Sequence, residues 1–189
     1  MDNIVIDDIF NDEEITSDEF NKLVVKRISQ HPGWYISGDE ERESQSVGDN
    51  YSDSGMLLES FYRSPNHDFK YHSDINDIAN IIFQKVLSCL PISFIEIEPV
   101  RFLWNYYNRS STGVIHRDMA ENTDGDFCSI VYHLNDCDGS TVIEDEFIES
   151  KSGRCILFDS KKIHYGTGTN KSPNRYCLNI VFKYKEIEI

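Results

Sequence analysis

The sequence lacks the closely spaced cysteine pairs that form zinc knuckles or small disulfide frameworks. Its five cysteines, Cys89, Cys128, Cys137, Cys155 and Cys177, are odd in number, and no CxxC pair occurs. This usage is typical of reduced thiols in a cytosolic protein. We therefore expect a cytoplasmic localisation and no structural disulfide.

The chain also has little positive charge and no long apolar run. It contains 18 Lys and Arg against 33 Asp and Glu, which gives a formal net charge of -15. Because nucleic-acid backbones are bound mainly through clustered Lys and Arg, this balance weighs against a general nucleic-acid binder. It does not exclude a small, local basic groove. No apolar run approaches 18 residues, and the acidic start MDNIVIDDIF has no basic region. We expect neither a membrane span nor a signal peptide.

What the chain does have is enough length and aromatic content for a folded domain. Its 189 residues include 11 Phe, 10 Tyr and 2 Trp, unlike a disordered composition. A first helix is predicted at 16–28, where Thr16 and Glu19 have the capping-box spacing. A second is predicted at 73–90, because its apolar residues recur at helical spacing and Pro91 ends the pattern.

A polar segment lies between the two predicted helices. Residues 37–54 are rich in Gly, Ser, Asp and Glu and show no apolar periodicity. The segment fits either a solvated loop or a mobile lid over a substrate site, and the sequence leaves both open.

The pattern changes after Pro91. Short apolar or alternating runs follow, separated by turn-like pieces: ISFIEIE, VRFLWNYY, FCSIVYHL, STVIE, RCILFDS and YCLNIVFKY. Many short strands with regular turns are typical of a β-sandwich or barrel. We predict a single, mainly β domain of the α+β class over 1–189, with helical support and a loop in 1–90 and the β core in 91–189.

Three side chains of the β region have the character of metal ligands. His116 and Asp118 are two residues apart, a spacing that puts both on one face of an extended chain. His164 follows GRCILFDSKKI and precedes a Gly-rich loop, and it is the natural third ligand. Two His and one carboxylate with open positions form the facial triad of non-heme Fe(II) oxygenases. Zinc more often takes a fourth ligand or a His-rich set.

Arg175 adds a cation at the start of the last predicted strand, eleven residues after His164. A dicarboxylate co-substrate on the metal would need a positive group for its far end. The guanidinium fork of arginine binds a carboxylate through two parallel hydrogen bonds. The connection YGTGTNKSPN is a plausible turn that returns Arg175 to the metal site.

His116-x-Asp118, His164 and Arg175 resemble the iron- and 2-oxoglutarate-dependent dioxygenases, nearest to their prolyl-4-hydroxylase-like branch. The similarity covers most of the chain, including VIDDIFNDEE, SIVYHLND, DGSTVIED and SGRCILFDSKKIHYGTG. The resemblance implies a double-stranded β-helix, a cupin-like jelly roll whose mouth holds the metal. It also implies hydroxylation of a C–H bond with Fe(II), 2-oxoglutarate and O2, and with ascorbate as an optional supporting reductant.

Asn105 and Tyr107 precede His116 by eleven and nine residues, in WNYYN. This Asn-x-Tyr resembles that of the alkylation-repair dioxygenases, whose corresponding side chains hydrogen-bond 2-oxoglutarate. Both residues would share one strand face, which suits a cofactor-binding role, and a packing or turn role is the alternative. Cys177 departs from the Ser or Thr that the family often has two residues after the basic residue. The second hydrogen bond to the distal carboxylate would then come from elsewhere, with Tyr107 as a candidate.

Two other side chains have two interpretations each. Arg101 is either a second anion contact or part of a salt bridge at a strand edge. His133 lines the pocket if it points inward, and otherwise it is a packing histidine with satisfied hydrogen bonds.

The substrate is the open question at this stage. The prolyl-hydroxylase-like layout favours a protein or peptide residue such as proline. A small metabolite or an alkylated nucleobase is the alternative, and the acidic charge weighs against nucleic acid. From another class of function, the chain fits a non-redox, cupin-like metal protein. The sequence does not indicate an oligomeric state.

Overall fold

The computed structural model describes residues 1–10, 16–34, 56–62, 70–71, 73–92, 94–109 and 111–186. The predicted loop or lid at 37–54 lies outside these residues. No helix within the described ranges is long and apolar enough to span a membrane.

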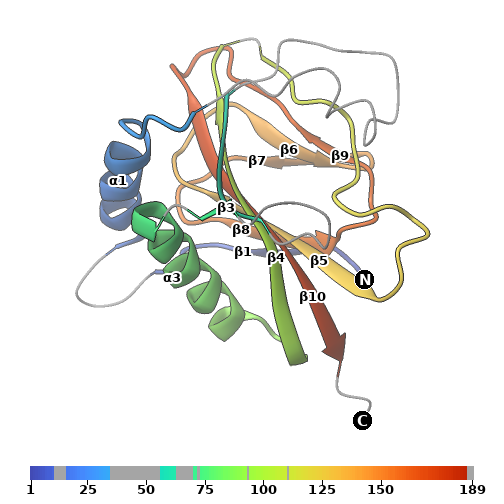
Figure 1. Ribbon diagram of the computed structural model, residues 1–189. Coiled ribbons are helices and arrows are strands. Elements are labelled where there is room, and N and C mark those ends of the chain that lie inside the picture. Colours follow the sequence, from blue (N-terminus) through green and yellow to red (C-terminus); the bar gives the residue numbers. More distant parts are fainter. Residues whose placement is uncertain are drawn as a thin grey trace.

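The described strands form two antiparallel sheets that face each other as a jelly roll (Figure 1). The larger sheet contains, in spatial order, β1 (Ile4–Ile6), β8 (Cys155–Asp159), β5 (Asp126–His133), β10 (Arg175–Glu186), β4 (Phe94–Tyr107), β2 (Met56–Tyr62) and β3 (Lys70–Tyr71). The smaller sheet contains β7 (Glu146–Glu149), β6 (Ser140–Ile143) and β9 (His164–Gly166). The predicted mainly β, double-stranded β-helix fold is confirmed.

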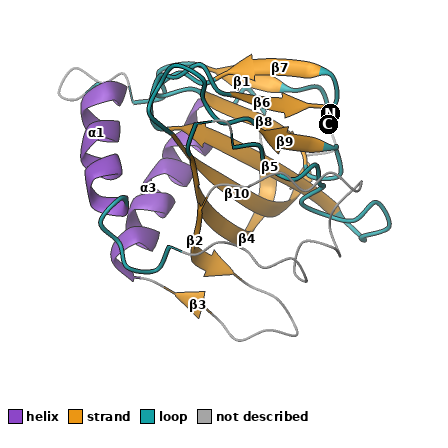
Figure 2. Ribbon diagram, turned by 90° about the horizontal axis from the view of Figure 1, so that it is seen from above, coloured by secondary structure: helices purple, strands orange, loops and turns teal. Residues whose placement is uncertain are grey.

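Two helices, α1 (Ser17–Ile28) and α3 (Ser73–Cys89), cover one face of the larger sheet (Figure 2). The predicted capping box at the start of α1 is present, with Thr16 and Glu19 each bonding the backbone of the other. The apolar stripe of α3 is buried, as its spacing predicts. Phe83 packs between Phe102 of β4 and Phe182 of β10, with ring centroids 5.6 Å and 5.4 Å away.

Strand alternation gives the larger sheet two different faces. Trp104 and Leu178 point into the core shared with the helices. Their neighbours of opposite parity face the smaller sheet, where a second apolar cluster contains Val131, Ile143, Ile148, Ile156, Phe158 and Cys177. The polar residues of the candidate site lie on this inner face.

The structure differs from the predicted strands in one fusion and in several unpredicted strands. ISFIEIE and VRFLWNYY form one continuous strand, β4, which runs through Pro99. A register shift opposite Val181 and Phe182 of β10 accommodates the proline, which has no N–H for the ladder. The sequence also did not indicate β2, β3, β7 and β9, although β2 pairs with β4 and both β7 and β9 pair with β6.

The segment before β5 extends the smaller sheet along β9. Isolated bridges pair Thr112 with Thr167 and His116 with His164. The His116 amide donates to the His164 carbonyl at 3.0 Å, and the reverse bond measures 2.9 Å. This reciprocal pairing places the two histidines directly opposite each other.

Candidate metal centre

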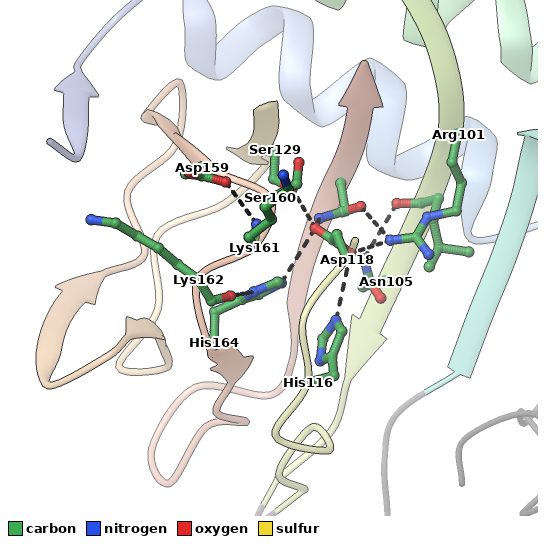
Figure 3. Close-up of polar contacts among 12 residues, drawn as sticks. Arg101, Asn105, His116, Asp118, Ser129, Asp159, Ser160, Lys161, Lys162 and His164 are labelled. Carbon is green, nitrogen blue, oxygen red and sulfur yellow. Dashed lines mark hydrogen bonds and ion pairs between the residues drawn. The ribbon is translucent and has the colours of Figure 1, made fainter. Parts of the chain in front are cut away.

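His116, Asp118 and His164 form a compact cluster in the mouth of the jelly roll. One ligand atom from each lies within 4.8 Å of the other two. The Asp118 carboxylate sits between the histidines, 3.6 Å from His116 Nε2 through Oδ1 and 3.4 Å from His164 Nε2 through Oδ2 (Figure 3). The structure therefore brings together all three residues that the sequence selects.

Both imidazole rings are oriented by the same local contact. Nδ1 of His116 lies 2.8 Å from the Val114 carbonyl, and Nδ1 of His164 lies 3.1 Å from the Lys162 carbonyl. A ring that donates its Nδ1 proton to a carbonyl presents an unprotonated Nε2, the arrangement common for metal-bound histidines. Nε2 of His164 is buried and has no hydrogen-bond partner among the described residues. A metal ion would satisfy this atom.

The charge states of the cluster also suit a metal. Burial lowers the pKa of His116, which favours the neutral imidazole. Burial alone would raise the pKa of Asp118, but the nearby Arg101 guanidinium outweighs it and holds that pKa well below its usual range. Neutral imidazoles and an ionised carboxylate are the forms that bind metal. Two nitrogens and one oxygen fit divalent iron with open positions.

Polar side chains from three strands bond the Asp118 carboxylate. Ser129 of β5 donates to Oδ2 at 2.5 Å, and Asn179 of β10 donates to the same oxygen at 3.2 Å. Ser160 lies 2.8 Å from the Ser129 hydroxyl. Arg101 of β4 pairs with Oδ1, so it forms the ion pair of one sequence interpretation, but within the sheet and not at a strand edge.

Arg175 lies deep between the sheets and is only 1% exposed. Its Nε donates to Ser150 Oγ at 3.2 Å, Nη1 to the Thr167 carbonyl at 3.1 Å and Nη2 to Thr141 Oγ1 at 2.6 Å. The ring of Tyr107 lies 5.0 Å below the guanidinium carbon. All of these partners are neutral.

No carboxylate within the described ranges forms an ion pair with Arg175. His133 Nε2 lies 3.4 Å from Nη2, but burial and the neighbouring arginines hold the pKa of His133 well below its usual range, so this ring is neutral. A buried charge without a counter-ion is costly, and an anionic ligand would compensate it. His133 points inward, as the interpretation that places it in the pocket requires.

Tyr107 and Arg175 converge beside Gly166, two residues after His164. The two residues are opposite each other in the β4–β10 ladder. A Cβ added to Gly166 would lie 2.6 Å from Tyr107 Oη and 2.7 Å from Arg175 Nη1. The missing side chain therefore lets the Tyr107 hydroxyl and the Arg175 guanidinium come close to the Gly166 backbone, where the two groups meet. The co-substrate role expected for Tyr107 stays a prediction.

Asn105 and Cys177 do not join Tyr107 and Arg175 beside Gly166. The Asn105 amide donates to the Leu103 carbonyl at 3.2 Å, and Figure 3 shows its side chain near Asp118. Its predicted co-substrate role stays a prediction. Cys177 is buried in the apolar cluster between the sheets, which agrees with the expectation that another residue supplies the second hydrogen bond to a distal carboxylate.

Replacement of Gly166 with alanine tests the close approach of Tyr107 and Arg175 at this position. We expect the new methyl group to displace Tyr107 Oη and Arg175 Nη1 and to weaken 2-oxoglutarate binding about tenfold or more, equivalent to about 1.4 kcal/mol. Metal binding should be retained, because both ligand histidines keep their backbone pairing. Isothermal titration with each ligand separates the two effects. Gly33→Ala is the control, since its Cβ would meet His31 at 3.0 Å and Leu58 at 3.1 Å, outside the site. Unchanged co-substrate affinity in Gly166→Ala would contradict this location.

Four residues of this site have no role assigned from the sequence: Ser129, Thr141, Gly166 and Asn179. A signal exists for two of them. Ser129 and Asn179 are polar residues inside the otherwise apolar runs FCSIV and LNIVF. Such positions are buried in the structure, where polar groups need partners.

Comparison with known proteins supports the fold. No protein-family profile and no curated protein matches the chain. Among solved structures, a prolyl hydroxylase from Trichoplax adhaerens, in complex with a hypoxia inducible factor peptide fragment, is similar with a TM-score of 0.63 and 14% identity, over 96% of this chain and 83% of that one.

Two further structures illustrate the range of similar proteins. The viral collagen prolyl hydroxylase of Paramecium Bursaria Chlorella virus-1, in its 2-oxoglutarate complex, gives a TM-score of 0.57 and 12% identity, over 97% of this chain and 96% of that one. The non-heme alpha-ketoglutarate-dependent epimerase SnoN of nogalamycin biosynthesis gives a TM-score of 0.62 and 8% identity, over 99% of this chain and 80% of that one. The chain shares the jelly-roll fold of these oxygenases.

Proposed function

We propose that the protein is an Fe(II)- and 2-oxoglutarate-dependent dioxygenase that hydroxylates a C–H bond. One observation carries the proposal: a His-Asp-His cluster shares a jelly-roll mouth with a buried arginine that has no counter-ion among the described residues. When bound, the iron, the keto acid and O2 would supply oxidative decarboxylation to succinate and CO2, and with it the oxidising power for C–H cleavage.

The chain's own residues would bind, orient and shield. His116, Asp118 and His164 hold the metal and leave its other positions free. Arg175 pairs with the far carboxylate of 2-oxoglutarate, and Tyr107 donates its hydroxyl proton to the same group. The apolar cluster between the sheets keeps water from this end of the site, which strengthens the ion pair.

A protein or peptide residue such as proline is the substrate class we propose, in a cytoplasmic enzyme that ascorbate would support. The similar Trichoplax structure contains a peptide, which favours this class. The test is to incubate the enzyme with Fe(II), 2-oxoglutarate and proline-containing peptides, and to measure succinate and peptide mass. Peptide-dependent succinate with a gain of one oxygen atom is the expected result. Succinate formation that no peptide stimulates would contradict the substrate class.

A small metabolite is the second candidate. The TM-score to the epimerase SnoN, 0.62, nearly equals that to the prolyl hydroxylase, 0.63. The shared fold therefore does not discriminate between the two substrate classes. Metabolite-dependent succinate formation, in the absence of any peptide effect, would favour this candidate.

A further inference from the structure

We infer that Arg101 is a positioning residue that fixes the orientation of the Asp118 carboxylate and thereby sets the metal affinity of the cluster. The inference rests on the proposed function, because it concerns the same metal ligands. It adds a residue from β4, a strand that contributes no ligand to the cluster.

Arg101 belongs to a closed ring of three side chains. Its Nη2 donates to Asp118 Oδ1 and also to Asn179 Oδ1, the latter at 3.1 Å. The Asn179 amide in turn donates to Asp118 Oδ2 at 3.2 Å. Figure 3 shows the guanidinium reaching Asp118 from the side opposite His164. One nitrogen of Arg101 thus holds the carboxylate directly and also orients the amide that holds its second oxygen.

The hydrogen bonds determine which oxygen remains for a metal. A carboxylate offers about four lone-pair positions, two on each oxygen. Ser129 and Asn179 use both positions on Oδ2, and Arg101 uses one on Oδ1. The remaining position is on Oδ1. Asp118 would therefore bind the metal through Oδ1 alone, and the guanidinium would share that oxygen.

Two opposing effects follow from this arrangement. A guanidinium beside a divalent ion repels it, which lowers affinity. Loss of Arg101 would, however, release Oδ1 and would remove the donor that orients the Asn179 amide. Removal of hydrogen-bond partners behind metal ligands typically lowers affinity 10- to 100-fold. Asp118 is buried, and Asn179, one of its two other donors, depends on this ring, so orientation outweighs repulsion.

The test is a titration of Co(II), as a spectroscopic substitute for Fe(II), into metal-free wild-type protein and variants. Arg101→Met should bind cobalt about 10- to 100-fold more weakly and change its visible absorption. Arg101→Lys should restore most of the affinity, because one nitrogen makes both contacts and an ammonium group has three donors.

Arg154→Met is the matched control. The Arg154 side chain is 13% exposed, against 14% for Arg101, and it also pairs with an aspartate, through a 2.6 Å contact to Asp7. It contacts none of the three cluster residues in the described structure. Cobalt affinity and spectrum should be those of the wild type.

The outcomes separate this inference from the proposed function. Wild-type protein that binds no cobalt would overturn both. A different outcome would overturn the inference alone: the wild type binds cobalt, and the Arg101→Met variant binds it as tightly or more tightly. If circular dichroism shows that Arg101→Met does not fold, Arg101→Gln carries the test. Wild-type affinity in that variant overturns the inference, and weakened binding supports it.

Discussion

Replacement of His164 with alanine is expected to abolish succinate formation. The change removes one of three ligands and leaves a pair, His116 and Asp118, that cannot hold divalent iron in the same geometry. We expect metal affinity to fall by more than the roughly 10- to 100-fold that is typical when a hydrogen-bond partner of a metal ligand is removed. Succinate production and metal content per chain are the measurements.

The control for this variant is His31→Ala. His31 lies outside the cluster, next to Asp74 at 3.8 Å, and its loss should leave metal content and activity unchanged. Far-ultraviolet circular dichroism shows whether each variant is folded. A folded His164→Ala protein with full activity would show that the cluster is not the metal site.

Replacement of Arg175 with methionine is expected to weaken 2-oxoglutarate binding about 30- to 4,000-fold. This range corresponds to the roughly 2–5 kcal/mol typically lost when one partner of a buried, hydrogen-bonded charge pair is removed. Metal affinity should be retained, since Arg175 bonds none of the three cluster residues. Isothermal titration of metal-loaded protein with 2-oxoglutarate measures the loss.

Thermal unfolding gives an independent readout for Arg175→Met. A ligand that binds only the folded state raises the melting temperature. Saturating 2-oxoglutarate should therefore stabilise the wild type and Arg154→Met but not Arg175→Met at the same concentration. Arg175→Lys, which keeps the charge and loses the planar fork, should be intermediate. Equal stabilisation of wild type and Arg175→Met would contradict the assigned role of the arginine.

The three residues of the cluster could be selected from the sequence because their signals are local. His116 and Asp118 share a strand face by spacing alone, and His164 is recognisable from its position between a strand and a Gly-rich loop. The helix starting after Thr16 is equally local, because the capping box lies within four residues. Such features depend on nearby sequence and not on tertiary pairing.

The contacts behind Asp118 could not be predicted for the opposite reason. Ser129 and Asn179, and also Arg101, whose partner the sequence left open, reach Asp118 only because β4, β10 and β5 are neighbours in a particular register. A shift of one residue would turn each of these side chains to the helix-covered face. Arg175 illustrates both cases. Its position after His164 suggested an anion contact, whereas its neutral surroundings are visible only in the fold.

The most direct test of the account is the absorption of the protein with Fe(II) and 2-oxoglutarate under anaerobic conditions. A keto acid chelated to Fe(II) gives a weak metal-to-ligand charge-transfer band in the visible region. We expect this band in the wild type and its loss in His164→Ala. Absence of the band in folded wild-type protein, together with zinc retained through purification, would contradict the proposed dioxygenase and favour a non-redox metal protein.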